Sequence, residues 1–298
     1  MIKMLSLDNF VLCVAVFLSA VHSLAAHFEH KENAKLLLIS FDGFRWDYLQ
    51  RAGRERTPNF HSIIDSGVHP KWVKDAFITR TFPNHFTLVT GLYEETHGVV
   101  GNRMFDRKLN ETFVHTPGQM TEAKWWDSGV GALPIWTANQ IGGNGRKSGV
   151  VFWPGSLVQF SNVLPYQSLG QFNASTRFED IIDIMIKWYK DEHSPINFGA
   201  IYFSQPDHLG HMVGPNDPKI SDLVAQLDRD VVGRLLEKVK ADEDLNEDLN
   251  IIITSDHGMT EVTEDRVIQV DKYMDTNLFT AYTNAPVWQI IPNPGELD

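Results

Sequence analysis

Four short apolar runs recur along the chain, and turn-forming or charged residues bound each of them. They cover 35–41 (KLLLISF), 148–153 (SGVVFW), 197–203 (NFGAIYF) and 249–254 (LNIIIT). A short continuous apolar run is typical of a strand that is buried on both faces of a parallel sheet. These runs therefore predict four central strands, and weaker apolar stretches predict two further strands over 68–77 and 285–291.

Apolar residues with helical spacing fill the segments between these strands. They predict helices over 57–67, 83–91, 134–140, 175–191 and 217–239. Pro83 is expected at the first position of the second helix, because the N–H that proline lacks has no partner there. Thr176 and Glu179 have the spacing of a capping box in the fourth helix, and Asp217 is the expected cap of the fifth. The acidic run 242–248 is interpreted as a solvated loop.

The order of these elements predicts the fold class. Buried strands that alternate with amphipathic helices are typical of an α/β protein with a mostly parallel central sheet and helices on both faces. The chain has 298 residues, 43% of them hydrophobic, which is enough for a large core. It contains no internal repeat and no Pro/Ser-rich linker, so we expect residues 26–298 to form one domain.

Residues 1–25 have the pattern of a secretory signal peptide. An apolar run over 10–20 is followed by small residues, among them Ala25 and Ala26. The run is too short to cross a membrane, and an N-terminal core helix is the alternative interpretation. Because the only cysteine, Cys13, lies inside this run, the mature chain would have neither disulfides nor thiol chemistry.

Two triplets match the N-glycosylation acceptor pattern. They begin at Asn110 (NET) and at Asn173 (NAS). If the chain is secreted, these asparagines are predicted to be glycosylated surface positions.

Charge narrows the range of partners. Acidic residues outnumber basic ones, 38 to 26, and the formal net charge is −12. Binding to nucleic-acid polymers requires a basic surface, so we expect none. A small anionic ligand is compatible with this charge where a bound metal ion supplies local positive charge.

Three of the predicted strands are followed by an aspartate: Asp42, Asp207 and Asp256. The ligand crevice of an open α/β sheet lies beyond the carboxyl ends of its strands, so these carboxylates should meet there. Each of them could instead cap a helix. Two histidines accompany them, His211 four residues after Asp207 and His257 directly after Asp256. Oxygen and nitrogen ligands together suit zinc better than magnesium, so we predict a zinc site.

Thr81 lies between the stretch 68–77 and the helix that follows it. At the start of a helix its hydroxyl would be surrounded by free backbone N–H groups, which favour a bound phosphate. The hydroxyl is either a helix cap or a nucleophile, if a neighbouring group removes its proton.

Several motifs together resemble the ectonucleotide pyrophosphatase/phosphodiesterase family of the alkaline-phosphatase-like superfamily. They are SFDGFR (40–45), TFPNH (81–85), VTGLY (89–93), THG (96–98), WPG (153–155), PDHLGHMVGP (206–215) and ITSDHGM (253–259). The resemblance extends from about Lys35 to Pro292. It implies an alkaline-phosphatase-like fold and an enzyme with two zinc ions.

The resemblance also implies roles for the residues that match. Thr81 is similar to the nucleophile that forms a nucleotidyl-threonine, and it belongs with Asp42, Asp256 and His257 to one zinc site. Asp207 and His211 are similar to two of the three ligands of the second zinc.

The substrate-binding residues are implied in the same way. Asn102 resembles an asparagine that holds a phosphate oxygen, and Phe82 resembles an aromatic residue that stacks on a nucleotide base. Phe172 lies where a second aromatic wall is expected. Leu157 stands where some nucleotide-cleaving members have an acidic residue, a departure that leaves the preferred base open.

The resulting prediction is a phosphodiesterase/pyrophosphatase that acts on nucleotides, either secreted or at the extracellular face of the plasma membrane. A choline-phosphate esterase of the same family is the alternative, because aromatic walls also bind a trimethylammonium group. A catalytically inactive protein with the same fold is the other alternative.

We further expect the chain to be incomplete at its C-terminus and nearly inactive. No histidine follows His257, whereas the family pattern places the third ligand of the second zinc on a downstream histidine. The missing part is also where a membrane anchor would lie. His208 or His85 as a replacement ligand is the alternative.

Overall fold

A five-stranded parallel sheet forms the centre of the computed structural model, which describes residues 34–282 and 287–296. The predicted signal peptide therefore lies outside the described residues. The strand order is β5-β4-β6-β1-β7, and each neighbouring pair is parallel. The strands are β1 (Lys35–Phe41), β4 (Ser148–Val151), β5 (Gln167–Ser168), β6 (Phe198–Phe203) and β7 (Leu249–Thr254).

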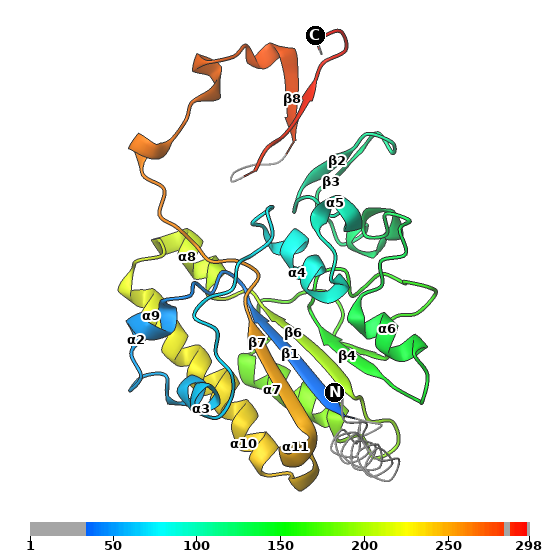
Figure 1. Ribbon diagram of the computed structural model, residues 1–298, viewed down its shortest axis with the longest axis vertical. Helices are drawn as coiled ribbons and strands as arrows, with labels where there is room; N and C mark the ends of the chain where they lie inside the picture. The colour runs from blue at the N-terminus through cyan, green and yellow to red at the C-terminus, as the bar shows by residue number, and fades with distance from the viewer. Residues whose placement is uncertain (1–33, 283–286, 297–298) are drawn as a thin grey trace, which may run out of the picture. The chain divides into compact units, whose positions relative to one another are not determined.

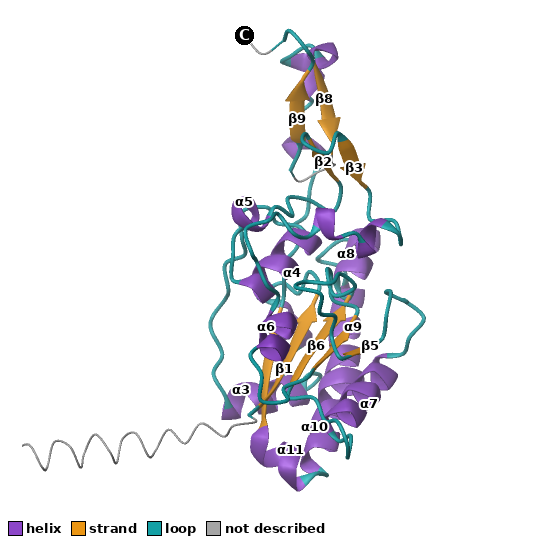
Figure 2. Cartoon of the chain, turned by 90° about the vertical axis from the view of Figure 1, so that its right-hand side faces the viewer, coloured by secondary structure: helices purple, strands orange, loops and turns teal. Residues whose placement is uncertain are grey.

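Helices cover both faces of this sheet, as predicted (Figure 1). Alternate residues of β1 separate the two cores: Leu37 and Ile39 face one cluster of apolar side chains, and Leu38 faces the other. The first cluster includes residues of α3 (Pro58–Ser66), α7 (Phe178–Tyr189) and α10 (Arg234–Lys240). The second includes residues of α4 (Thr81–Thr90) and α6 (Ile135–Ile141), and Figure 2 shows α6 beside the strands on this side.

Shorter elements complete the described fold. The remaining helices are α2 (Tyr48–Ala52), α5 (Glu94–His97), α8 (Asp207–Val213), α9 (Pro218–Leu227) and α11 (Glu243–Asp248). Two antiparallel hairpins are formed by β2 (Met104–Asp106) with β3 (Glu111–Phe113) and by β8 (Phe279–Tyr282) with β9 (Gln289–Pro292). The Gln289 side-chain amide exchanges two hydrogen bonds of 2.8 Å with the backbone of Phe105, so it joins the two hairpins.

The predicted strands agree closely with the structure, with three exceptions. β7 was predicted to be a central strand buried on both faces, and this was wrong, because it lies at the edge of the described sheet and its residue Ile252 is 48% exposed. β4 ends at Val151, because Phe152 adopts a left-handed backbone (φ 60°) that cannot continue a strand. The stretch 68–77 was predicted to be a strand, and this was wrong, since it is irregular and highly exposed. Residues 283–286 lie outside the described part, so only 287–291 of the predicted last strand can be compared, and β9 overlaps them.

Several predicted helix boundaries are corrected by hydrogen bonding. The long helix 217–239 is divided into α9, a π-helical segment (Asp228–Gly233) and α10, while the Asp217 side chain caps α9 by accepting the Lys219 N–H. The capping box was wrong, because α7 begins at Phe178 without a side-chain cap.

The acidic run 242–248 was interpreted as a loop, and this was also wrong. It forms α11, with Asp242 as the side-chain cap. Burial of Leu245 favours this helix, because its side chain is 1% exposed in the core. Burial of one leucine is worth about 2 kcal/mol, more than exposed acidic neighbours cost. Among the described helices, none is long and apolar enough to span a membrane.

Candidate active site

The strands β1, β6 and β7 bring three aspartates to one edge of the sheet. Phe41 pairs with Phe203, and Ser40 pairs with Thr254, so the segments after the three strands emerge together. The Asp207 N–H donates to the Asp42 carbonyl at 2.9 Å, and the Gly43 N–H donates to Asp256 Oδ1 at 3.0 Å. The predicted convergence of the three residues is therefore present.

Gly43 makes this approach possible. Its backbone has φ +65°, which glycine adopts without strain. A Cβ atom there would lie 2.8 Å from Asp207 Cβ, which is too close for two carbon atoms. A side chain at position 43 would separate Asp42 from Asp207.

The carboxylates are buried with an incomplete set of partners. Asp42 and Asp256 are both 2% exposed. Each of the three aspartates has one carboxylate oxygen that is buried without a hydrogen-bond partner in the described structure. These oxygens are Asp42 Oδ1, Asp207 Oδ1 and Asp256 Oδ2. Buried polar atoms are normally paired, and buried negative charges need a positive partner. The donor set therefore fits a bound cation.

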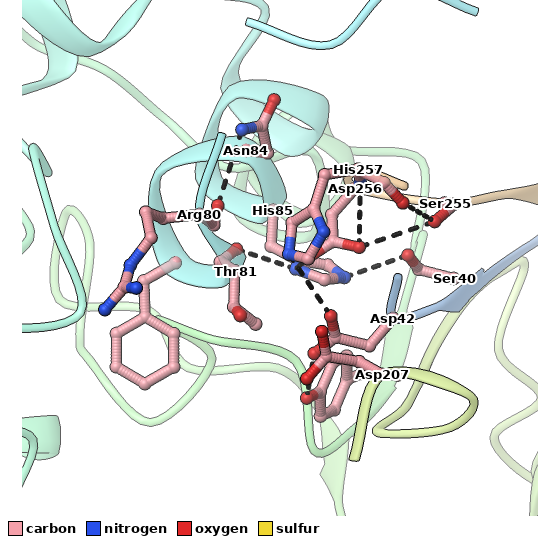
Figure 3. A network of polar contacts seen from close by, with 12 residues as sticks. Ser40, Asp42, Arg80, Thr81, Asn84, His85, Asp207, Ser255, Asp256 and His257 are labelled. Atoms are coloured by element: carbon pink, nitrogen blue, oxygen red, sulfur yellow. Dashed lines mark hydrogen bonds and ion pairs between the residues drawn. The ribbon is translucent and has the colours of Figure 1, made fainter. Parts of the chain in front are cut away.

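His257 completes one group of metal-ligating atoms. Its Nε2 lies 3.4 Å from Asp42 Oδ1 and 3.2 Å from Asp256 Oδ2, next to both unpartnered oxygens (Figure 3). One ligand atom from each of the three residues lies within 4.8 Å of the others. Two carboxylates and an imidazole are a ligand set that zinc accepts.

Asp207 and His211 form a second, more open pair. Both belong to α8, where the i, i+4 spacing places them on one face, and His211 Nε2 lies 3.4 Å from Asp207 Oδ1. The His211 side chain is 73% exposed. The neighbouring His208 is exposed as well.

Burial and mutual repulsion perturb the acids of the site. Burial raises the pKa of Asp42 well above its usual value, and the neighbouring Asp256 and Asp207 raise it further. Burial also raises the pKa of Asp207, although His211 and His257 oppose the shift. Burial would likewise raise the pKa of Asp256, but the adjacent His85 and His257 outweigh it and lower this pKa to about 2.

Thr81 is the first residue of α4, so it does occupy a helix N-terminus. Pro83 was expected at the first helical position but lies at the third, where its missing N–H is still one that the helix leaves unpaired. Figure 3 shows Thr81 beside the group formed by Asp42, Asp207, Asp256 and His257.

His85 contacts the first turn of α4 through a backbone carbonyl. Its Nδ1 lies 2.7 Å from the Thr81 carbonyl and 3.3 Å from Asp256 Oδ2, and its Nε2 lies 2.8 Å from Ser40 Oγ. The carbonyl only accepts hydrogen bonds, so Nδ1 carries the proton and donates it to the carbonyl, while the Ser40 hydroxyl donates to Nε2. Both ring nitrogens of His85 face Thr81, Asp256 and Ser40, so His85 does not complete the Asp207–His211 pair.

Asn102 is fixed by the same helix N-terminus. The Phe82 N–H donates to Asn102 Oδ1 at 2.9 Å. This bond identifies the oxygen end of the amide, so the NH₂ end is the one that can donate to a ligand. The Phe82 ring packs in an aromatic group, with centroids 5.7 Å from Trp126, 5.9 Å from His115 and 6.2 Å from Phe113.

Phe172 contacts the site through Tyr202, which donates to Asp42. Its side chain is half exposed, and its ring contacts Tyr202 at 5.9 Å. Asn110 and Asn173, the predicted glycosylation positions, are both exposed. Leu157 is partly buried in the turn that follows Trp153.

Sequence reasoning missed two residues that contact the predicted ligands. The Tyr202 hydroxyl donates to Asp42 Oδ2 at 2.6 Å, and His85, which was considered only as an alternative ligand of the second zinc, lies 3.3 Å from Asp256 Oδ2. Tyr202 lies in a continuous apolar run, and a tyrosine in such a run is normally interpreted as a core residue. His85 carried a weak signal, because its spacing from Thr81 places both on one face of a helix.

The fold and the candidate metal-ligating group are compatible with a phosphodiesterase domain, and the comparisons identify the family. The sequence profile of the family "type I phosphodiesterase / nucleotide pyrophosphatase" matches residues 36–298, so the chain belongs to this family. Human ectonucleotide pyrophosphatase/phosphodiesterase family member 5 is 41% identical over 283 residues, which are 95% of this chain and 57% of that relative. Human bis(5'-adenosyl)-triphosphatase ENPP4 is 38% identical over 258 residues, 87% of this chain and 54% of the relative. The chain thus spans slightly more than half the length of these relatives.

Solved structures are similar as well. Murine ectonucleotide pyrophosphatase/phosphodiesterase 5, in an inactive variant with a threonine replaced by alanine and in complex with AMP, has a TM-score of 0.80 and 41% identity. The match covers 89% of this chain and 68% of that one. The human protein of the same name also has a TM-score of 0.80, with 42% identity. This similarity confirms the expected alkaline-phosphatase-like fold.

Proposed function

We propose that the chain carries the catalytic residues of a two-zinc hydrolase that cleaves phosphodiester or pyrophosphate bonds of nucleotides, with Thr81 as the nucleophile. One observation carries this proposal. Three buried carboxylate oxygens without hydrogen-bond partners lie at the edge of the sheet beside the helix N-terminus that bears Thr81. Their negative charge suits a cation, and the helix N-terminus suits a phosphate.

The residues divide into two metal sites. Asp42, Asp256 and His257 would hold one zinc together with the Thr81 hydroxyl, and Asp207 and His211 would contribute to the other. Zinc, when bound, lowers the pKa of a coordinated hydroxyl and offsets the charge that builds up on the phosphate oxygens.

The chain itself positions the nucleophile and the phosphate. His85 fixes the carbonyl of Thr81 and thereby the first turn of α4. The Asn102 NH₂ group donates to a non-bridging phosphate oxygen, while its oxygen is kept in place by the Phe82 N–H. Thr81 Oγ forms a bond to phosphorus as the bond to the leaving-group oxygen breaks. Water then displaces the nucleotide from Thr81 and restores the hydroxyl.

Nucleotides are the favoured substrate class. A solved relative is in complex with AMP, and the names of the relatives specify nucleotide pyrophosphatase or bis(5'-adenosyl)-triphosphatase activity. Phe82 and Phe172 offer aromatic surface for a base. The "ecto" in these names also supports a secreted enzyme or one at the extracellular face of the plasma membrane.

The decisive experiment compares Thr81→Ala with Thr81→Ser and with Thr90→Ala, a matched change at the other end of the same helix. In a chain that also carries the downstream ligand of the second zinc, we expect Thr81→Ala to lower turnover of a nitrophenyl nucleotide ester by at least about 1,000-fold. Its zinc content, circular dichroism and AMP affinity should stay close to those of the unsubstituted chain. Thr81→Ser should retain part of the activity, and Thr90→Ala most of it. Near-normal turnover by the Thr81→Ala variant would refute the assignment.

A further inference from the structure

The two oxygens of Asp42 have different surroundings. Oδ2 accepts the hydrogen bond from the Tyr202 hydroxyl at 2.6 Å. Oδ1 has no hydrogen-bond partner in the described structure and lies 3.4 Å from His257 Nε2. The Tyr202 hydroxyl therefore makes the two oxygens of this buried carboxylate different. Oδ2 is hydrogen-bonded, and Oδ1 faces the candidate ligand His257.

The fold determines where this hydroxyl points. In the parallel pairing of β1 with β6, Tyr202 is opposite Ser40, two residues before Asp42. The Tyr202 ring meets the His85 ring edge-on, with centroids 4.9 Å apart and an interplanar angle of 88°. Phe172 contacts the ring as well, at 5.9 Å and 64°. Packing against both rings restricts the tyrosine side chain, so the position of its hydroxyl oxygen is fixed before any ligand arrives.

We propose that Tyr202 is a positioning residue that makes Asp42 a one-oxygen ligand, with Oδ1 presented to the cation. This inference rests on the proposed function, because it requires a metal ion between Asp42, Asp256 and His257. Zinc in a four-ligand site binds carboxylates at short, directed distances. Calcium takes more oxygens and often uses both oxygens of one carboxylate. By occupying Oδ2, Tyr202 should therefore favour zinc over calcium at this site.

The test uses Tyr202→Phe, which removes the hydroxyl and keeps the ring. The matched control is Tyr189→Phe in α7, where a more deeply buried tyrosine donates to the Leu36 carbonyl in the core. Zinc and calcium affinities of the full 298-residue chain are measured by competition with a chromophoric chelator, and folding is followed by thermal melting. We expect Tyr202→Phe to weaken zinc binding about 10- to 100-fold, as for other groups that orient metal ligands.

Calcium affinity should fall less than zinc affinity, because the freed Oδ2 becomes a second calcium ligand, so the zinc-to-calcium affinity ratio decreases. Tyr189→Phe should leave both affinities unchanged, even if it melts earlier. Unchanged zinc affinity in Tyr202→Phe, or an equal loss for both metals, would show that Tyr202 serves packing alone and overturn the inference. Failure of the unsubstituted chain to bind zinc would instead contradict the proposed function, and the inference with it.

Discussion

The carboxylate of Asp228 accepts the backbone N–H of Phe60 at 2.7 Å, although the two residues are 168 positions apart in the chain. The same carboxylate accepts the N–H and the side-chain amide of Asn59 at 3.2 and 2.8 Å. Asp228 is 1% exposed and begins the π-helical segment between α9 and α10. Since Thr57 makes no side-chain cap bond, this distant aspartate satisfies the first N–H groups of α3.

Asp228→Ala should therefore destabilise the fold. Hydrogen bonds to a charged group are worth about 1.5–3 kcal/mol each, and their loss leaves buried donors unpaired. We expect the free energy of unfolding in urea to fall by about 2–4 kcal/mol. Asp222→Ala, which removes an exposed ion pair with Arg56, should cost less than about 1 kcal/mol. A similar decrease in the free energy of unfolding in Asp228→Ala and Asp222→Ala would contradict the capping role of Asp228.

His97 should make stability sensitive to acid. It is 1% exposed, accepts the Val99 N–H at Nδ1 and contacts Thr87 Oγ1 through Nε2. Burial lowers its pKa from 6.5 to about 4 in the folded state. Between these values the unfolded chain binds the proton more readily, so the stabilisation is complete above pH 6.5 and is lost as the pH falls toward 4.

The measurement is the free energy of unfolding across that pH range, together with the NMR titration of the His97 ring. We expect His97 to add a slope on the order of 1 kcal/mol per pH unit. His97→Gln keeps a donor and an acceptor but cannot titrate, so its stability should depend less steeply on pH. A His97 ring that titrates in the folded protein with an ordinary histidine pKa would refute this account.

The two metal sites should bind zinc with unequal affinity. Asp42, Asp256 and His257 are three close ligands, whereas Asp207 and the exposed His211 are two. Calorimetric titration should resolve a tight and a weaker zinc ion. Asp256→Asn should remove the tight ion and His211→Ala the weaker one.

His208→Ala is the control, and it also tests whether His208 serves as a replacement ligand at the second site. We expect both ions to persist in this variant, since His208 is exposed and outside the group of close ligands. Loss of the weaker ion on replacing His208 would assign that histidine to the Asp207 site. Equal affinities for both ions would contradict the difference inferred from ligand number and exposure.

Phe82 should contribute to the binding of a nucleotide base. Stacking of a base on an aromatic side chain is worth about 1–3 kcal/mol, so Phe82→Ala should raise the KM of a nucleotide ester correspondingly. A phosphocholine ester, which has no base, serves as the control substrate and should be affected less. An equal increase in KM for both substrates would mean that Phe82 acts by packing in the aromatic group around Trp126 and Phe113, and not by stacking on a base.

The central sheet was predictable because continuous apolar runs mark β1 and β7, and the bounds of both strands agree with those runs. Whether β7 is buried on both faces was not predictable from its run, because burial depends on the position of the strand in the sheet, and β7 lies at the edge. The meeting of Asp42, Asp207 and Asp256 followed from strand direction alone. The bond between Tyr202 and Asp42 was not predictable, since it depends on the register of β6 against β1. The helix at 243–248 depends on a tertiary contact of Leu245, which outweighs a locally acidic composition.

The contact between Asp207 N–H and the Asp42 carbonyl has a consequence for redesign. This bond joins the main chains of the two proposed metal sites, and it lies next to Gly43, where a side chain would collide with Asp207. Exchanging ligand side chains to accept another metal would therefore change which ion is held but not the spacing of the two backbone anchors. The spacing of the two proposed ions would then be set by the backbone, and engineered variants would keep the same spacing around the phosphate that they accommodate.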